Sequence, residues 1–113
     1  MTRRAPAFVR AFAGRWRIVE MDQWDDLDLV EPAHITFTGK DRGRFVFMAV
    51  EGDLDIRYGS RDGSACAEFS WEGFDDNNAS SGRGWVAVGT AGRLVGHIFI
   101  HNGDDSGFVP ERE

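Results

Sequence analysis

Cysteine, lysine and long apolar runs are scarce in this chain. Cys66 is the one cysteine, so the sequence offers no partner for an internal disulfide. Lys40 is the one lysine. No apolar stretch reaches the length of a signal-peptide core or of a membrane span. These absences predict a protein of a reducing compartment, the cytoplasm, with no membrane partner.

Positive charge is also in short supply. Lys and Arg total 13 against 19 Asp and Glu, which gives a net charge of −6 at pH 7. Nucleic-acid binding requires cationic side chains that replace counterions along the phosphates. The charge balance therefore argues against a nucleic-acid partner, and we expect Arg3, Arg4 and Arg10 to form a solvated end of the chain.

The sequence carries no metal, phosphate-loop or cofactor motif. His97 and His101 have the spacing of a helical metal site, but the residues between them favour a strand, which would separate the two rings by roughly 13 Å. The acidic run 22–28 lacks the glycine and the ordered alternation of a calcium loop. We therefore expect neither a metal nor a cofactor.

Length and composition predict one β-rich domain over residues 1–113. Nine Phe, four Trp and fourteen Gly are typical of strands joined by tight turns. Segment 5–12 is predicted to be a short helix or turn. Strands are predicted at 16–21, 33–38, 44–50, 80–88, 93–101 and 106–110, with two more bounded by the turns Glu51-Gly52 and Asp62-Gly63 and the loop 73–79. These eight strands predict an all-β, antiparallel up-and-down meander that closes into a small barrel.

The two glycine turns set the expected register of the central strands. Phe47 is predicted to face Ile56 across the first turn, and Arg57 to face Glu68 across the second as a cross-strand ion pair. The second turn also predicts three pairs on one face: Tyr58 with Ala67, Ile56 with Phe69, and Leu54 with Trp71. Cys66 shares the outward alternation of Glu68, which predicts an exposed thiol.

Phe12, Gly14 and Trp16 place a Gly-x-Trp motif at the start of the first strand. With the acidic segment and the meander that follow, this motif resembles the calycin superfamily of lipocalins and fatty-acid-binding proteins. The resemblance implies that Trp16 closes one barrel end beneath a cationic side chain of the last strand, for which Arg112 is the matching residue. The whole chain also resembles short bacterial proteins with no assigned function.

One face of the two strands at 80–88 and 93–101 mixes aromatic, cationic and histidine side chains. The reverse face carries aliphatic residues and glycines, the glycines admitting the bulk of Phe69 and Trp71. The pattern leaves open whether the mixed face lies outside the barrel or lines an internal cavity. In the predicted pairing its residues are Arg83 opposite Phe99, Trp85 opposite His97, and Ser81 near His101.

The first functional hypothesis is a barrel that binds a small apolar or aromatic molecule. Segment 22–32, with Trp24 and Leu27, would be its lid. The other candidate contacts are Trp71, Arg83, Trp85, His97, Phe99 and His101.

Two further hypotheses come from other classes of protein. With a filled core, the mixed face would be a protein-interaction or homodimer surface anchored by Arg83, and the acidity of the chain would suit a basic partner. In a small barrel enzyme, His97 or His101 would act as general base, helped by Asp104 or Asp105.

Overall fold

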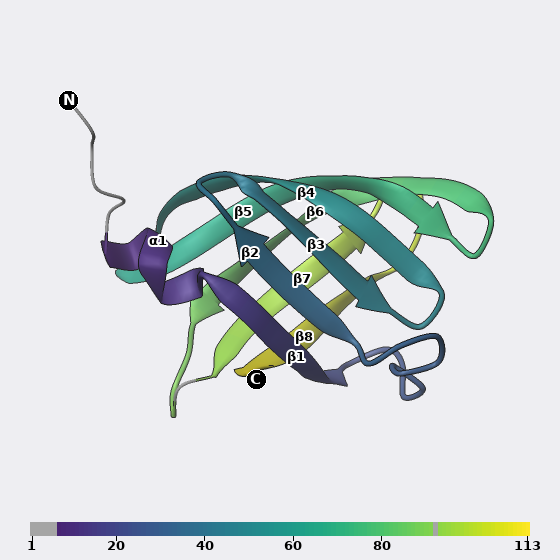
Figure 1. The fold of residues 1–113 in the computed structure, drawn as a ribbon, viewed down its shortest axis with the longest axis horizontal. Helices are drawn as coiled ribbons and strands as arrows, with labels where there is room; N and C mark the ends of the chain where they lie inside the picture. Colours follow the sequence, from purple (N-terminus) through teal and green to yellow (C-terminus); the bar gives the residue numbers. More distant parts are fainter. Residues whose placement is uncertain (1–6, 92) are drawn as a thin grey trace.

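The computed structural model describes residues 7–91 and 93–113, which form one helix and eight strands (Figure 1). Neighbouring strands pair antiparallel, and β1 also pairs with β8, so the sheet closes into a barrel. The predicted all-β meander is confirmed. Among these residues no helix has the length and the apolar character that a membrane crossing requires. The elements are α1 Ala7–Phe12, β1 Gly14–Met21, β2 His34–Thr38, β3 Arg42–Phe47, β4 Val50–Arg61, β5 Ser64–Asp75, β6 Asn78–Val88, β7 Leu94–Ile100 and β8 Asp105–Arg112.

The register between β4 and β5 agrees with the prediction, whereas the register between β3 and β4 does not. Tyr58 with Ala67, Ile56 with Phe69 and Leu54 with Trp71 all pair as expected. Phe47, however, pairs with Val50 and not with Ile56, because the chain turns at Met48 and Ala49. Met48 has a left-handed φ of 52°, and neither residue is a usual signal for a turn.

Two other local predictions are wrong. Arg57 faces Glu68, but its ion pair is with Asp55 on its own strand, at 2.8 Å. The predicted loop 73–79 is absent, since β5 and β6 continue through it and are joined by a turn at Asp76 and Asn77. Asp76 has a φ of 59°, which aspartate tolerates better than most residues. The result is a long, twisted hairpin.

Side chains fill the centre of the barrel. Phe45, Phe69 and Trp71 point inward and are at most 4% exposed. Phe45 stacks on Phe47 with 5.6 Å between ring centroids, and it meets the ring of Trp71 edge-on at 5.0 Å. The central cavity that these rings help to bound has a volume of about 10 Å³, which is room for at most one water molecule.

Two glycines of β6 make this filling possible. Gly84 pairs with Phe69 and Gly82 pairs with Trp71. A Cβ atom on Gly84 would lie 2.5 Å from the Phe69 ring, and one on Gly82 would lie 2.7 Å from the indole nitrogen of Trp71. The glycines therefore admit the two large side chains, as the sequence predicts.

One end of the barrel is closed by α1 and the first residues of β1. Phe12 is fully buried and accepts a hydrogen bond at its carbonyl from the Trp16 indole, at 2.9 Å. The Arg112 guanidinium lies 4.1 Å from the Trp16 ring centroid and donates to the carbonyls of Ala13 and Ala11 at 2.8 and 2.9 Å. Gly14 permits this approach with a φ of 102°. The contact expected between Trp16 and Arg112 is therefore present.

The loop 22–33 between β1 and β2 caps the opposite end (Figure 1). Trp24 stacks on Phe47 with 5.4 Å between ring centroids, and Leu27 is buried in the core. The Met48 amide donates to the Leu27 carbonyl at 2.7 Å. The segment that the sequence identifies as a lid is therefore packed onto the barrel.

Substitution of Gly84 by alanine tests the close approach of Phe69. The new Cβ would crowd both the Phe69 ring and, at 2.8 Å, the backbone carbonyl of His97, so we expect Gly84→Ala to lower the free energy of unfolding by about 1–3 kcal/mol. Gly59→Ala on β4 is the matched control, because a Cβ there meets open space. Its effect should stay within about 0.5 kcal/mol. Equal losses for both variants in denaturant titrations would show that the Gly84 contact is not tight.

Candidate functional site

The mixed face of β6 and β7 lies on the outside of the barrel. Arg83, Trp85 and Phe99 point outward, whereas Val86, which follows Trp85, and Ile98, which precedes Phe99, are buried in the core. This settles the question of inside or outside that the sequence leaves open. The inside of these strands is aliphatic because it must fit between the large rings of β3 and β5.

Two rows of outward residues run across the strands on this face. The register places Asp55, Ser70, Arg83, Phe99 and Asp105 directly opposite one another on successive strands from β4 to β8. The neighbouring row places the next outward residues in the same way: Arg57, Glu68, Trp85, His97 and Gly107.

Two adjoining hollows lie on this face, with volumes of about 1030 and 500 Å³. Both are lined by Asp55, Arg57, Ser70, Arg83 and Phe99. Together they form what we call the outer groove. The larger hollow extends to Glu72, Ser81 and His101, and the smaller one to Arg61, Glu68 and Trp85.

Cationic side chains concentrate at the aromatic end of the outer groove. The Arg61 guanidinium lies over the Trp85 ring, 4.4 Å from its centroid. Neither Arg61 nor Arg83 forms an ion pair within residues 7–91 and 93–113. Arg57 is held by Asp55. An acidic chain thus has a local surface where two guanidinium groups remain available beside aromatic rings.

His97 lies beside the outer groove in contact with a carboxylate. Its Nε2 is 2.6 Å from Oδ2 of Asp105, and its ring centroid is 4.7 Å from that of Phe99. A carboxylate in this position orients the imidazole, which is one requirement of a general base. The hydroxyl of Ser106 is no partner for it, because that side chain is buried and donates to the Gly107 carbonyl.

The structure does not bring all the predicted ligand contacts together. Trp71 is 1% exposed in the core, and its indole donates to the Phe99 carbonyl at 3.3 Å. Trp24 belongs to the cap on Phe47, away from the outer groove. His101 is exposed at the end of the larger hollow. Trp71 borders the larger hollow from below but exposes almost no surface to it. The predicted contacts that do present surface in the outer groove are Arg83, Trp85, Phe99 and His101.

Several residues of the outer groove were not among the predicted contacts, including Asp55, Ser70 and Arg61. Ser70 and Asp55 could have been found by extending the cross-strand count from Arg83 over two more strands. Arg61 could not, because it lies at the far end of β4 and reaches Trp85 only through the twist of the sheet. Within the described residues no three His, Cys, Asp or Glu side chains converge on a position that could hold a metal ion.

Cys66 departs from its expected exposure. It alternates with outward residues, yet it is 2% exposed between Gly59 and Ala87. Burial raises the pKa of the Cys66 thiol, the charge of Glu68 raises it further, and Arg61 partly offsets both. Burial likewise raises the pKa of the Tyr58 phenol. A raised pKa means less thiolate at neutral pH, so Cys66 is not an activated nucleophile.

No family model, curated protein or solved structure matches this chain. Function is therefore inferred here from the filled barrel and from the geometry of the outer groove.

Two arginine variants test which of Arg112 and Arg83 stabilises the fold and which is left to contact a partner. Arg112→Ala removes two hydrogen bonds and the contact with Trp16, so we expect a loss of about 1–3 kcal/mol in the free energy of unfolding. Arg83→Ala removes no ion pair and should change it by less than about 0.5 kcal/mol. Thermal and denaturant unfolding measure both. A large loss for Arg83→Ala would mean that this side chain supports the fold.

Thiol reactivity tests the burial of Cys66. In the native protein at pH 8 we expect an aromatic disulfide reagent to react at least about tenfold more slowly with Cys66 than with a free cysteine peptide. The reaction should become fast in guanidinium chloride, because unfolding exposes the thiol and restores its ordinary pKa. Similar rates in the native and unfolded states would contradict the burial.

Proposed function

We propose that this protein is a protein-interaction module and that the outer groove is its binding surface. The proposal rests on two features seen together: the interior of the barrel is filled, and its outer face has an open groove lined by arginine and aromatic side chains. The central cavity has about 10 Å³, and both ends are capped by buried side chains, Phe12 at one and Leu27 at the other. Recognition is therefore assigned to the outside of the barrel.

The composition of the outer groove favours a protein partner over a small molecule. Small ligands are bound in pockets that bury most of their surface, whereas these hollows are open and spread over several strands. Tryptophan and arginine are the residues most enriched among interface hot spots, and Trp85 lies here with Arg61 and Arg83. The net charge of the chain favours a basic partner, but the local charge at Arg61 and Arg83 favours an acidic contact.

A small aromatic ligand is the second candidate. It is favoured by the hollow of about 500 Å³ that Trp85 and Phe99 line together. Arg83 would then bind an anionic group of the ligand, as the guanidinium does for carboxylates.

We also propose that the barrel is calycin-like and that the protein is a bacterial, cytoplasmic one. The first proposal is supported by the order of the strands, by the Gly14-x-Trp16 motif and by Arg112 over the Trp16 ring. The cytoplasmic location is supported by the single cysteine, which needs no oxidising compartment.

Affinity capture with matched charge variants tests the interaction module. The tagged protein, the variant Arg83→Glu and the control Arg15→Glu are each used to capture proteins from cells of the source organism. Arg15 forms an exposed ion pair with Glu113 on the β1 side of the barrel, so its loss should matter little.

We expect Arg83→Glu to lower the recovery and affinity of a specific protein by at least about tenfold, the scale of a hot spot, while Arg15→Glu leaves them unchanged. The identified protein is then purified and titrated against all three. If a partner binds all three equally, the outer groove is not its site. If only small aromatic acids bind, and Arg83→Glu abolishes this, the second candidate replaces the first.

A further inference from the structure

Two aliphatic side chains on the capping loop are left in solvent. Leu29 is 65% exposed and Val30 is 68% exposed, the largest exposures among the large hydrophobic side chains that the structure describes. Their neighbour Leu27 is buried in the core. The loop thus places one aliphatic group inside the barrel and presents two outside it.

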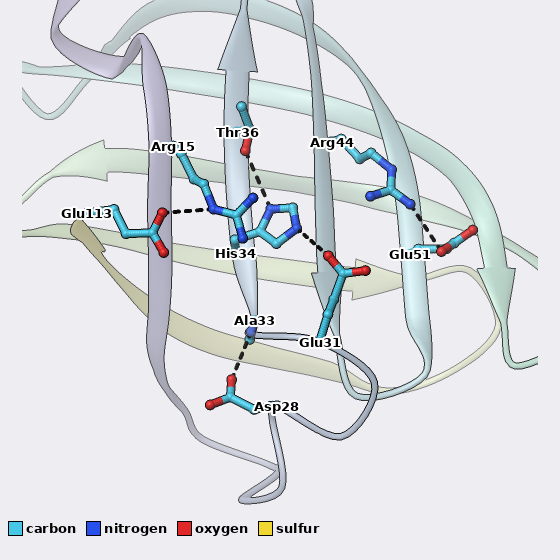
Figure 2. Close-up of polar contacts among 9 residues, drawn as sticks. All are labelled: Arg15, Asp28, Glu31, Ala33, His34, Thr36, Arg44, Glu51 and Glu113. Carbon is cyan, nitrogen blue, oxygen red and sulfur yellow. Dashed lines mark hydrogen bonds and ion pairs between the residues drawn. The ribbon is translucent and has the colours of Figure 1, made fainter.

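The residues on either side of this pair, Asp28 and Glu31, make polar contacts with Ala33 and His34 (Figure 2). Asp28 accepts a hydrogen bond from the Ala33 amide at 2.8 Å and pairs with Arg17 at 2.7 Å. Glu31 lies 3.1 Å from Nε2 of the buried His34. These contacts tie the backbone on both sides of the aliphatic pair to the barrel, and a tied segment loses less conformational entropy on binding than a free one.

The surroundings of the pair are acidic. Asp25 and Asp26 precede it, and neither forms an ion pair among the described residues. Segment 25–30 thus presents two aliphatic side chains next to two carboxylates without ion pairs, and we call it the acidic projection.

The aromatic end of the outer groove has the complementary chemistry. Arg61 and Arg83 lack ion pairs, and Trp85 and Phe99 line the same hollow. Guanidinium groups bind carboxylates in a directed geometry, and the rings offer apolar surface to aliphatic side chains. The charged residues of this hollow are three arginines and two carboxylates, so its net charge is positive. A projection with two carboxylates and two aliphatic groups therefore matches it in charge, with Arg83 and the Arg61 guanidinium over Trp85 as the cationic groups that lack ion pairs.

The two surfaces cannot meet within one molecule. The acidic projection is tied to β1 and β2 through Arg17 and Ala33, at one end of the barrel. The outer groove lies on the outside of β4 to β7.

Resting on the proposed function, we propose that the partner of the outer groove is the acidic projection of a second copy of this chain. The contact is head to tail, because the projection and the outer groove are different surfaces. Such contacts leave one of each free at the ends of the assembly, so association continues with concentration unless the rotation closes a ring.

A mixing experiment tests this arrangement. The groove variant Arg83→Glu keeps the projection, and the projection variant Leu29→Ser/Val30→Ser keeps the outer groove. Sedimentation velocity of the parent protein from about 10 μM to about 1 mM, a range that covers weak interfaces, should show growth beyond the monomer. Each variant alone should stay monomeric, and the equimolar mixture should form a one-to-one pair and nothing larger.

Controls separate the contact from a loss of folding. Val88→Ser removes an exposed aliphatic side chain at the end of β6, at 43% exposure and outside both surfaces, and should associate like the parent. Circular dichroism checks that every variant is folded. A parent protein that stays monomeric throughout overturns the proposal, and so does a mixture that fails to pair or a variant that still dimerises alone.

Failure of this inference is distinguishable from failure of the proposed function. If the parent is monomeric but Arg83→Glu still loses a captured foreign protein, self-association is wrong and the interaction module stands. If Arg83→Glu changes neither association nor capture, both are wrong.

Discussion

Phe69 and Trp71 can fill the barrel only because Gly84 and Gly82 lie opposite them on β6. Successive side chains of a strand point to opposite faces, so Gly82 and Gly84 lie on the same face of β6. Because Phe69 and Trp71 need the space that these glycines leave, that face is the one that points inward. Once the glycines are inside, Arg83 and Trp85 must be outside. The same packing that stabilises the core therefore fixes which positions of β6 face outward, among them those of Arg83 and Trp85.

The need to keep the filled core out of water also explains the two ends of the barrel. A closed sheet with a filled interior would still expose its end layers to water, and here each end is covered by a short segment. Phe12 with Trp16 and Arg112 covers one end, and the loop with Trp24 and Leu27 covers the other. The loop cannot open without exposing Leu27 and separating Trp24 from Phe47. We therefore regard it as a structural cap whose outer side is available for contacts.

Much of the fold could be predicted from alternation and turn chemistry. Strand order, the pairing of β4 with β5, and the pairing of Arg83 with Phe99 depend on counting from recognisable turns. The turn at Met48 could not be predicted, because its residues carry no local turn signal. Asp76 and Asn77 do carry one, but the acidic, amide-rich stretch around them also resembles a longer loop.

The candidate site could be predicted only in part, because it depends on which face of the sheet lies outside and on contacts between distant positions of the strands. Alternation places Trp85, Phe99 and Arg83 on one face but cannot say that this face is outside. It also cannot bring Arg61 to Trp85, since that contact depends on the twist accumulated along β4. Trp71 was a reasonable candidate by type, yet its neighbours in the barrel make it a core residue.

The central claim is that recognition takes place outside a filled barrel. The most direct test is to record methyl NMR spectra of the buried Ile35, Leu54 and Ile98 during titration with small apolar and aromatic compounds and, separately, with the bound partner. We expect no saturable shifts of these core methyl groups with any compound, and shifts confined to residues of the outer groove when the partner binds. Saturable shifts of the core methyl groups would show instead that the barrel opens to a ligand and that recognition takes place inside it.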